Sequence, residues 1–178
     1  MTEPAYNHDK FAELLVYIAS RVGNDATNGD TKLNKLLYFA DVTAYRRTGR
    51  PISGARYVHQ TYGPIAAPLI PVREELTGTR LDVAEQELPT GGVQRRTKAL
   101  DDPDVTAFTD TEKEIINEVI DRFRDCRAKE MADFAHGEPA WIMTQDGEDM
   151  SYRASLLARR ASPAALDFGK KLAERLGC

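Results

Sequence analysis

Residues 32–64 read KLNKLLYFADVTAYRRTGRPISGARYVHQTYGP, and the first part of this stretch has a strong helical pattern. Asp30 or Thr31 can cap the helix, and Gly49 can end it in a left-handed conformation. The helix also holds polar and aromatic groups that a helix with only a core role does not require. The apolar side chains that recur along its buried face are Leu33, Leu36, Leu37, Ala40 and Ala44.

Patterns on both sides of this stretch predict further elements. Apolar periodicity and capping residues predict helices over residues 8–22, from Pro64 or Pro68 to residue 76, over 110–123, 129–135, 151–160 and 163–177. A strand is expected at residues 56–62, and a hairpin from residues 81–88 and 93–100. These elements predict one domain over residues 1–178, with a core at about 10–160 and a C-terminal helix at 163–177. The expected fold class is α+β, mainly α, with a small antiparallel sheet of about three strands that includes the hairpin.

The composition is that of a soluble protein with its own core. The 178 residues are 42% hydrophobic and 29% charged, with a formal net charge of −4. No apolar run approaches the roughly 18 residues of a membrane span, and the N-terminus lacks the pattern of a signal peptide. With Cys126 and Cys178 as its two cysteines, the chain is expected in the reducing cytoplasm, without disulfides and without a membrane partner.

Residues that could form a catalytic or metal site are scarce. His8, His59 and His136 are far apart in the sequence, and the two cysteines lack the spacing of a zinc site. The chain has no phosphate-binding glycine loop and no GxSxG motif. We therefore expect no enzyme activity, no cofactor and no metal.

Charge is distributed unevenly along the chain. Residues 30–58 hold six basic side chains against two acidic ones, whereas residues 101–121 hold eight acidic side chains against one lysine. The basic region, together with Arg95, Arg96 and Lys98 on the hairpin, could meet phosphates as in a winged helix. However, the apolar face of the 30–48 helix is expected to be buried, and the short helix-turn-helix connection is missing. DNA-binding regulation is therefore an alternative, and nucleic acid is not the partner that the sequence favours.

Two segments of the chain resemble the Panacea domain, also described as the SocA-like antitoxin domain and formerly as an uncharacterised domain shared with phage-associated proteins. The first segment is LNKLLYFAD at 33–41, followed by TGRPI at 48–52, Tyr57 and YGP at 62–64. The second is HGEPAW at 136–141. Two departures concern local geometry, since Pro68 and Pro71 make the helix after Pro64 rich in proline, and Ala132 replaces a small hydroxyl residue. The family-motif positions are Asn34, Lys35, Tyr38, Asp41, Gly49, Tyr62, Gly63, Pro64, His136 and Trp141.

The resemblance implies an antitoxin that binds and blocks a protein toxin encoded beside it. One branch of the family instead delivers its toxin to a Clp-type protease, so the role of a protease adaptor is a second alternative. By this resemblance the chain is a binding module, and a homodimer remains open. The identity of the toxin does not follow from the sequence.

Individual motif residues carry structural expectations. Asn34 and Asp41 are two helical turns apart, so they are expected on one edge, bonded to a buried loop such as the backbone near Gly63. Tyr38 and Phe39 cannot both follow one apolar stripe, so one of them is expected at an interface. Trp141 is expected in the core with a partner for its indole N–H, and His136 as a cap of the preceding helix. The residues expected to contact a partner are Arg46, Arg47, Arg50 and Arg56.

Overall fold

A computed structural model describes residues 3–25, 27–89 and 91–157, so the helix predicted at 163–177 lies outside the described residues. Its α-helices are α1 (His8–Val22), α2 (Asp30–Thr48), α3 (Leu69–Leu76), α4 (Asp110–Arg122), α5 (Ala128–His136) and α6 (Pro139–Ile142). Its strands are β1 (Tyr57–Val58), β2 (Ile65–Ala66), β3 (Leu81–Glu87), β4 (Val93–Ala99) and β5 (Asp149–Met150), and two short 3₁₀ helices are η1 (Val105–Ala107) and η2 (Ala154–Leu156). The predicted class, α+β and mainly α, is confirmed.

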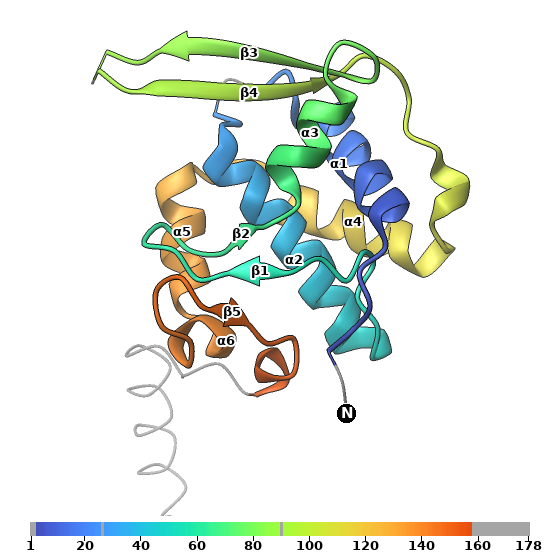
Figure 1. The fold of residues 1–178 in the computed structure, drawn as a ribbon, viewed down its shortest axis with the longest axis vertical. Helices are drawn as coiled ribbons and strands as arrows, with labels where there is room; N and C mark the ends of the chain where they lie inside the picture. Colours follow the sequence, from blue (N-terminus) through green and yellow to red (C-terminus); the bar gives the residue numbers. More distant parts are fainter. Residues whose placement is uncertain (1–2, 26, 90, 158–178) are drawn as a thin grey trace, which may run out of the picture.

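Helix α2 runs through the middle of the molecule, with the other elements arranged around it (Figure 1). It contacts α1, α4 and α5, and it also contacts β2 and the hairpin strand β4. The helix begins after Gly29, which supplies no side-chain cap, rather than after the predicted Asp30 or Thr31. It ends as predicted at Gly49, whose φ of 77° is left-handed.

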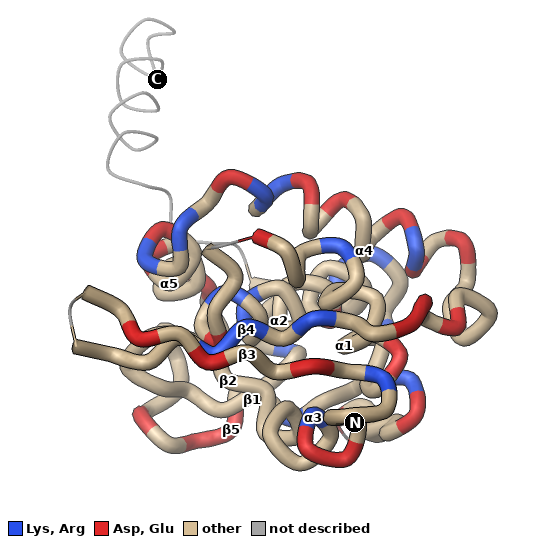
Figure 2. Tube along the Cα trace, turned by 90° about the horizontal axis from the view of Figure 1, so that it is seen from above, with Lys and Arg blue, Asp and Glu red and all other residues tan. Residues whose placement is uncertain are grey.

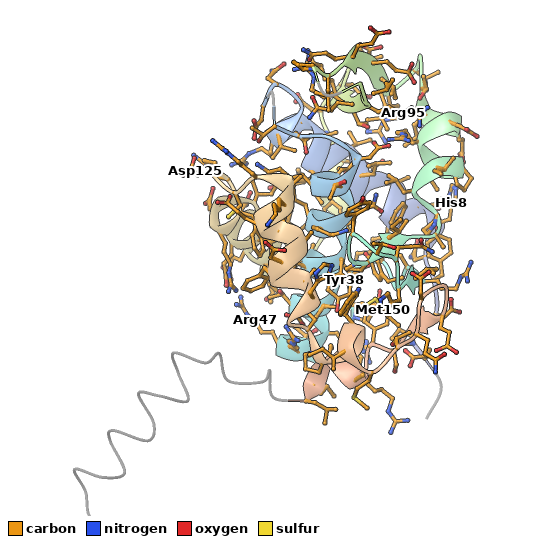
Figure 3. The ribbon with its side chains drawn as sticks, turned by 90° about the vertical axis from the view of Figure 1, so that its left-hand side faces the viewer. His8, Tyr38, Arg47, Arg95, Asp125 and Met150 are labelled. Atoms are coloured by element: carbon orange, nitrogen blue, oxygen red, sulfur yellow. The ribbon has the colours of Figure 1, made fainter. Side chains whose placement is uncertain are left out.

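The expectation that Tyr38 or Phe39 lies at an exposed interface is wrong. Both side chains are buried, with exposed fractions of 1% and 3%, and Figure 3 shows Tyr38 inside the molecule. The Tyr38 ring packs edge-to-face on Tyr57, whereas Phe39 stacks on Phe123 with 4.8 Å between ring centroids. Neighbours on several sides of α2 therefore bury more than one stripe of the helix.

The strands form two separate sheets. The first has the order β2-β1-β5, and Tyr57 pairs with both Ala66 and Met150 in antiparallel register. The second is the β3–β4 hairpin, in which Glu85 faces Arg95. The strand predicted at residues 56–62 is limited to Tyr57–Val58, because a turn that ends at Gly63 follows it.

The ends of most helices follow local signals in the sequence. Asn7 caps α1, and Thr109 forms a capping box with Glu112 at the start of α4. Pro71 lies in the first turn of α3, where its missing N–H leaves no bond unmade, so the short helix is regular. The helix predicted at 151–160 is wrong in its described part, where the chain leaves β5 and forms only the short helix η2.

Replacement of Phe39 by alanine should lower the free energy of unfolding by about 3–5 kcal/mol, because it empties a packed aromatic site between α2, α4 and α5. Urea denaturation measures this change. The matched control is Leu156→Ala on the exposed surface of η2, which should stay within about 0.5 kcal/mol of the parent chain. A Phe39→Ala loss as small as that of the control would contradict the central position of this ring.

Candidate functional site

Asn34 and Lys35 fasten the turn between β1 and β2 to the first half of α2. The Asn34 Oδ1 accepts a hydrogen bond from the Ala66 N–H at 2.9 Å, and its Nδ2 donates to the Asp30 carbonyl. The Lys35 Nζ donates to the Pro64 carbonyl at 3.1 Å. Both side chains thus serve backbone groups of the segment that follows Gly63.

Gly63 lies directly on the lysine side chain. Its φ is 88°, and a Cβ atom at this position would lie 2.8 Å from Lys35 Cε and 3.2 Å from Lys35 Nζ. Any other residue would therefore meet both backbone strain and a close contact. The geometry explains why a glycine, and not merely a turn former, stands before Pro64.

Lys35 is a buried amine whose acceptor is a backbone carbonyl and not a carboxylate. Its exposed fraction is 1%, and none of the carboxylates that the structure describes forms an ion pair with it. Desolvation by burial lowers the pKa of Lys35 to about 7. Lys32, equally buried one turn earlier, instead donates to Asp25 at 3.0 Å and to the Arg124 carbonyl at 2.8 Å.

Asp41 bonds a different loop from the one that Asn34 holds. Its carboxylate accepts from the Ser53 N–H at 2.7 Å, the Ser53 hydroxyl at 2.5 Å and the Tyr57 hydroxyl at 2.8 Å. The Tyr152 hydroxyl lies 3.2 Å from the same carboxylate and 2.8 Å from the Ala55 carbonyl. Asn34 and Asp41 lie two turns apart on α2, and each of them bonds a separate segment of the chain.

Burial sets the titration behaviour of this cluster. Desolvation raises the pKa of Asp41, although the hydrogen bonds from Ser53, Tyr57 and Tyr152 act in the opposite direction. Burial, and then the Asp41 charge, raise the pKa values of Tyr57 and Tyr152, so both phenols keep their protons. We read the cluster as a structural one, because its polar groups bond to one another.

Trp141 is held between two histidine rings. Its ring centroid lies 4.2 Å from that of His59 and 4.3 Å from that of His136. The indole N–H points to the Gln60 carbonyl at 3.5 Å, a long contact at the limit of a hydrogen bond. His136 is the last residue of α5, and its Nε2 makes no hydrogen bond to any described residue. The HGEPAW segment thus joins α5 and α6 to the turn after β1.

The four arginines expected at a partner differ in their surroundings. Arg46 donates to the Ser155 carbonyl at 2.7 Å and forms an ion pair with the buried Glu138. Arg47 pairs with Glu118 at 2.7 Å, and Arg56 with Asp149 at 2.8 Å. The guanidinium group of Arg50 forms no ion pair or hydrogen bond with any residue that the structure describes. Contact between these four arginines and a partner protein stays a prediction. Arg50 would lose no ion pair or side-chain hydrogen bond with a described residue if it bound such a partner.

No continuous basic face is seen in the view of Figure 2, where basic and acidic stretches alternate around α4 and α5. The basic residues of β4 lie beside acidic residues of β3, and Arg95 pairs with Glu85 at 2.8 Å. Figure 3 places Arg95 at the hairpin end of the molecule and Arg47 near its other end. This distribution does not favour the winged-helix alternative, in which the hairpin and α2 would share one basic surface.

A groove on the surface has the motif residues Asn34, Lys35 and Tyr62 in its wall. We call it the Tyr62 groove. It encloses about 200 Å³, and its other lining residues are Asp30, Thr31, Ile65, Leu69, Ile70 and Arg73. A neighbouring hollow of about 410 Å³ shares Ile70 and Arg73 and reaches Val83 and Arg95 of the hairpin. Sequence reasoning included Tyr62 but missed Ile65, Ile70 and Arg73, which lie on the short elements β2 and α3.

Within the described residues, no helix is long and apolar enough to cross a membrane. The same part of the chain contains no group of three or more His, Cys, Asp or Glu side chains that could hold a metal ion.

Replacing Asp41 by asparagine should lower the free energy of unfolding by about 2 kcal/mol or more, because an amide would face the Ser53 and tyrosine donors with N–H groups. Thermal or urea denaturation tests this. The control Asp149→Asn breaks only the exposed pair with Arg56 and should cost about 0–1 kcal/mol. Equal effects of the two substitutions would mean that the Asp41 cluster does not stabilise the fold.

Lys35 should make stability depend on pH. Its pKa in the fold, about 7, lies below the value of an unfolded lysine, so between about pH 7 and 10 the unfolded chain binds a proton that the folded chain does not. The free energy of unfolding should therefore rise with pH in that window, on the order of 1 kcal/mol per pH unit.

The measurement is a set of urea titrations from pH 6 to pH 10 on the parent chain, Lys35→Met and the exposed control Lys129→Met. The rise attributed to Lys35 should disappear in Lys35→Met and persist in the control. Parallel curves for all three proteins would show that Lys35 keeps an ordinary pKa in the fold.

Comparison with known proteins adds one finding. The family model described as "Antitoxin SocA-like, Panacea domain" matches residues 33–142, which include the motif residues from Asn34 to Trp141. No curated protein and no solved structure matches the chain. Because the match covers more than half of the sequence, the chain belongs to the SocA-like antitoxin family, with its Panacea domain at residues 33–142.

Proposed function

We propose that this protein is an antitoxin that neutralises a protein toxin, encoded by a neighbouring gene, by binding it directly. The observation that carries the proposal is the family match over residues 33–142. The proposal includes a cytoplasmic location, which agrees with a free thiol at Cys126.

The arrangement of polar groups supports a binding role. The most deeply buried polar side chains of α2, including Lys32, Asn34 and Asp41, are bonded to loops of the same chain. The exposed features near them are the apolar side chains of Tyr62, Ile65 and Ile70, and Arg50, whose guanidinium group pairs with none of the described residues. Surfaces of this composition suit recognition of another protein.

Neutralisation can follow from binding alone. A bound antitoxin blocks a toxin by covering its functional surface, or by binding an inactive conformation more tightly than an active one. Both routes require a stable complex, and neither requires a reaction at the antitoxin. The protein is therefore expected to act in proportion to its concentration relative to the toxin.

The test is co-expression with the product of the neighbouring gene. Growth should stop when that product is induced alone and should resume when this chain is co-expressed, because the complex removes free toxin. Co-purification of the two proteins at a fixed ratio should accompany the rescue. Phe39→Ala serves as the control, since loss of the folded core should abolish both rescue and complex. A neighbour without toxicity, or a toxic neighbour that this chain does not neutralise, would overturn the proposal.

The half-life of the toxin separates a blocker from a protease adaptor. A blocker should leave the toxin in the cell as a stable complex, because binding alone does not remove it. An adaptor should shorten the half-life, and the shortening should disappear in cells that lack Clp protease. Clp-dependent loss of the toxin would show that this chain is a protease adaptor and not a blocker. The antitoxin role would stand in either case.

A further inference from the structure

Resting on the proposed function, we propose that the toxin binds the free edge of β3 by adding an extended segment of its own to the hairpin. The segment pairs through backbone hydrogen bonds with Val83, Glu85 and Glu87. It carries basic side chains opposite the two glutamates and an apolar side chain opposite Val83. We call the outward-facing backbone of residues 83–87 the β3 edge.

The register of the hairpin decides which backbone groups of β3 face outward. The Arg80 carbonyl accepts from the Leu100 N–H at 2.9 Å, so the even-numbered residues of β3 bond to β4 and the odd-numbered residues point away from it. At the start of the strand, the Leu81 carbonyl accepts from the Gly78 N–H at 2.8 Å. The outward N–H and C=O groups of residues 83, 85 and 87 have no hydrogen bond to any described residue.

The β3 edge lies on the outer side of the hairpin. Figure 1 shows β4 between β3 and α2, and β4 is the strand that packs on α1 and α2. The end of α1 approaches β4 closely, since a Cβ atom at Gly23 would lie 2.9 Å from the Lys98 Cα and 3.1 Å from the Thr97 carbonyl oxygen. One strand is thus held against the body of the protein while the other keeps an open edge, to which an extended segment can add.

The charge of the β3 edge favours a basic segment. Val83, Glu85 and Glu87 lie on one face of the hairpin, because side chains two positions apart share a face. Glu87 forms no ion pair with any described residue, and Glu85 pairs with Arg95 in an exposed contact that contributes little. Basic side chains at alternate positions of an added strand would lie directly beside both carboxylates, as cross-strand neighbours.

The same charges disfavour pairing between two copies of this chain. In the antiparallel register that overlaps the whole edge, Glu85 of one copy would lie opposite Glu85 of the other. Val83 would lie opposite Glu87 in that register. Like charges directly opposite each other destabilise a strand pair, so the edge selects a different protein of opposite charge.

The apolar contact lies where β3 approaches α3. Val83 and Ile70 both line the hollow of about 410 Å³ between the hairpin and this helix. Ile70 is 58% exposed although it is apolar. A side chain opposite Val83 can cover both residues, and this burial fixes the register of the added strand.

Residue-resolved hydrogen exchange on the full chain, with and without the toxin identified by growth rescue, tests the pairing directly. In the free chain the amides of residues 82, 84 and 86 should exchange slowly, because they donate to β4, and those of residues 83, 85 and 87 should exchange fast. Toxin binding should slow exchange at residues 83, 85 and 87 about tenfold or more. Binding that leaves the alternating pattern unchanged would overturn the inference.

Charge reversal tests the basic character of the segment. The double variant Glu85→Lys, Glu87→Lys should bind the toxin about tenfold or more weakly, and its affinity should depend less on salt. The matched control Glu114→Lys, Asp125→Lys reverses two exposed acidic side chains that form no ion pair with a described residue, and its affinity should change less than about twofold. Equal losses in the two double variants would show that net charge, and not the β3 edge, governs binding.

A third comparison separates the backbone from the charge. Glu85→Pro and Glu85→Gln both remove the carboxylate, but only proline removes the outward N–H, which the hairpin does not use. Proline should therefore weaken binding about tenfold beyond the effect of glutamine. Thermal denaturation checks that both variants fold. If proline unfolds the chain, the exchange measurement on the unmodified protein decides the question by itself.

The outcomes separate this inference from the proposed function. If the parent chain neither binds nor rescues, the antitoxin proposal fails and the β3 assignment fails with it. If the parent binds and rescues but the amides of the β3 edge gain no protection, only the β3 assignment is overturned. A homodimer of the free chain that Glu85→Pro dissociates would also overturn it, since the edge would then pair two copies.

Discussion

A helix buried on several sides must satisfy every polar group that it carries, and α2 carries Lys32, Asn34, Lys35 and Asp41 in buried positions. Three segments supply the partners of these groups: the loop after α1 bonds Lys32, the turn between β1 and β2 bonds Asn34 and Lys35, and the segment at Ser53 bonds Asp41. The positions of these loops therefore follow from the needs of one helix. These loops contain little regular structure of their own, so the bonds to α2 fix their positions.

This view gives the family motif a physical meaning. The LNKLLYFAD segment supplies both the apolar contacts and the polar attachments of α2, while YGP supplies the turn that Asn34 and Lys35 hold. The HGEPAW segment contacts the same turn through the Trp141 indole N–H and the Gln60 carbonyl. Segments far apart in the sequence thus share one structural task, which is to fix the turn beneath Tyr62.

The sequence was informative where structure is local. The Asn7 cap, the Thr109 capping box and the Gly49 stop depend on neighbouring residues, and the structure contains these three signals. Bonds between distant segments could not be predicted in this way. Tyr152 reaches the Asp41 cluster across 111 positions, and nothing in its local sequence separates it from a residue of the helix expected there. The Tyr62 groove was likewise hidden, because β2 and α3 bring its wall together.

The packing of Trp141 against His59 and His136 has a consequence for the fluorescence of the protein. Trp141 is the single tryptophan of the chain, so intrinsic fluorescence excited in the indole band comes from one known environment. The indole lies against two imidazole rings and beside Gln60, two positions before Tyr62. Events at the turn can therefore be followed through the emission of an unlabelled protein. Trp141 is thus a native fluorescent reporter of the turn that bears Tyr62.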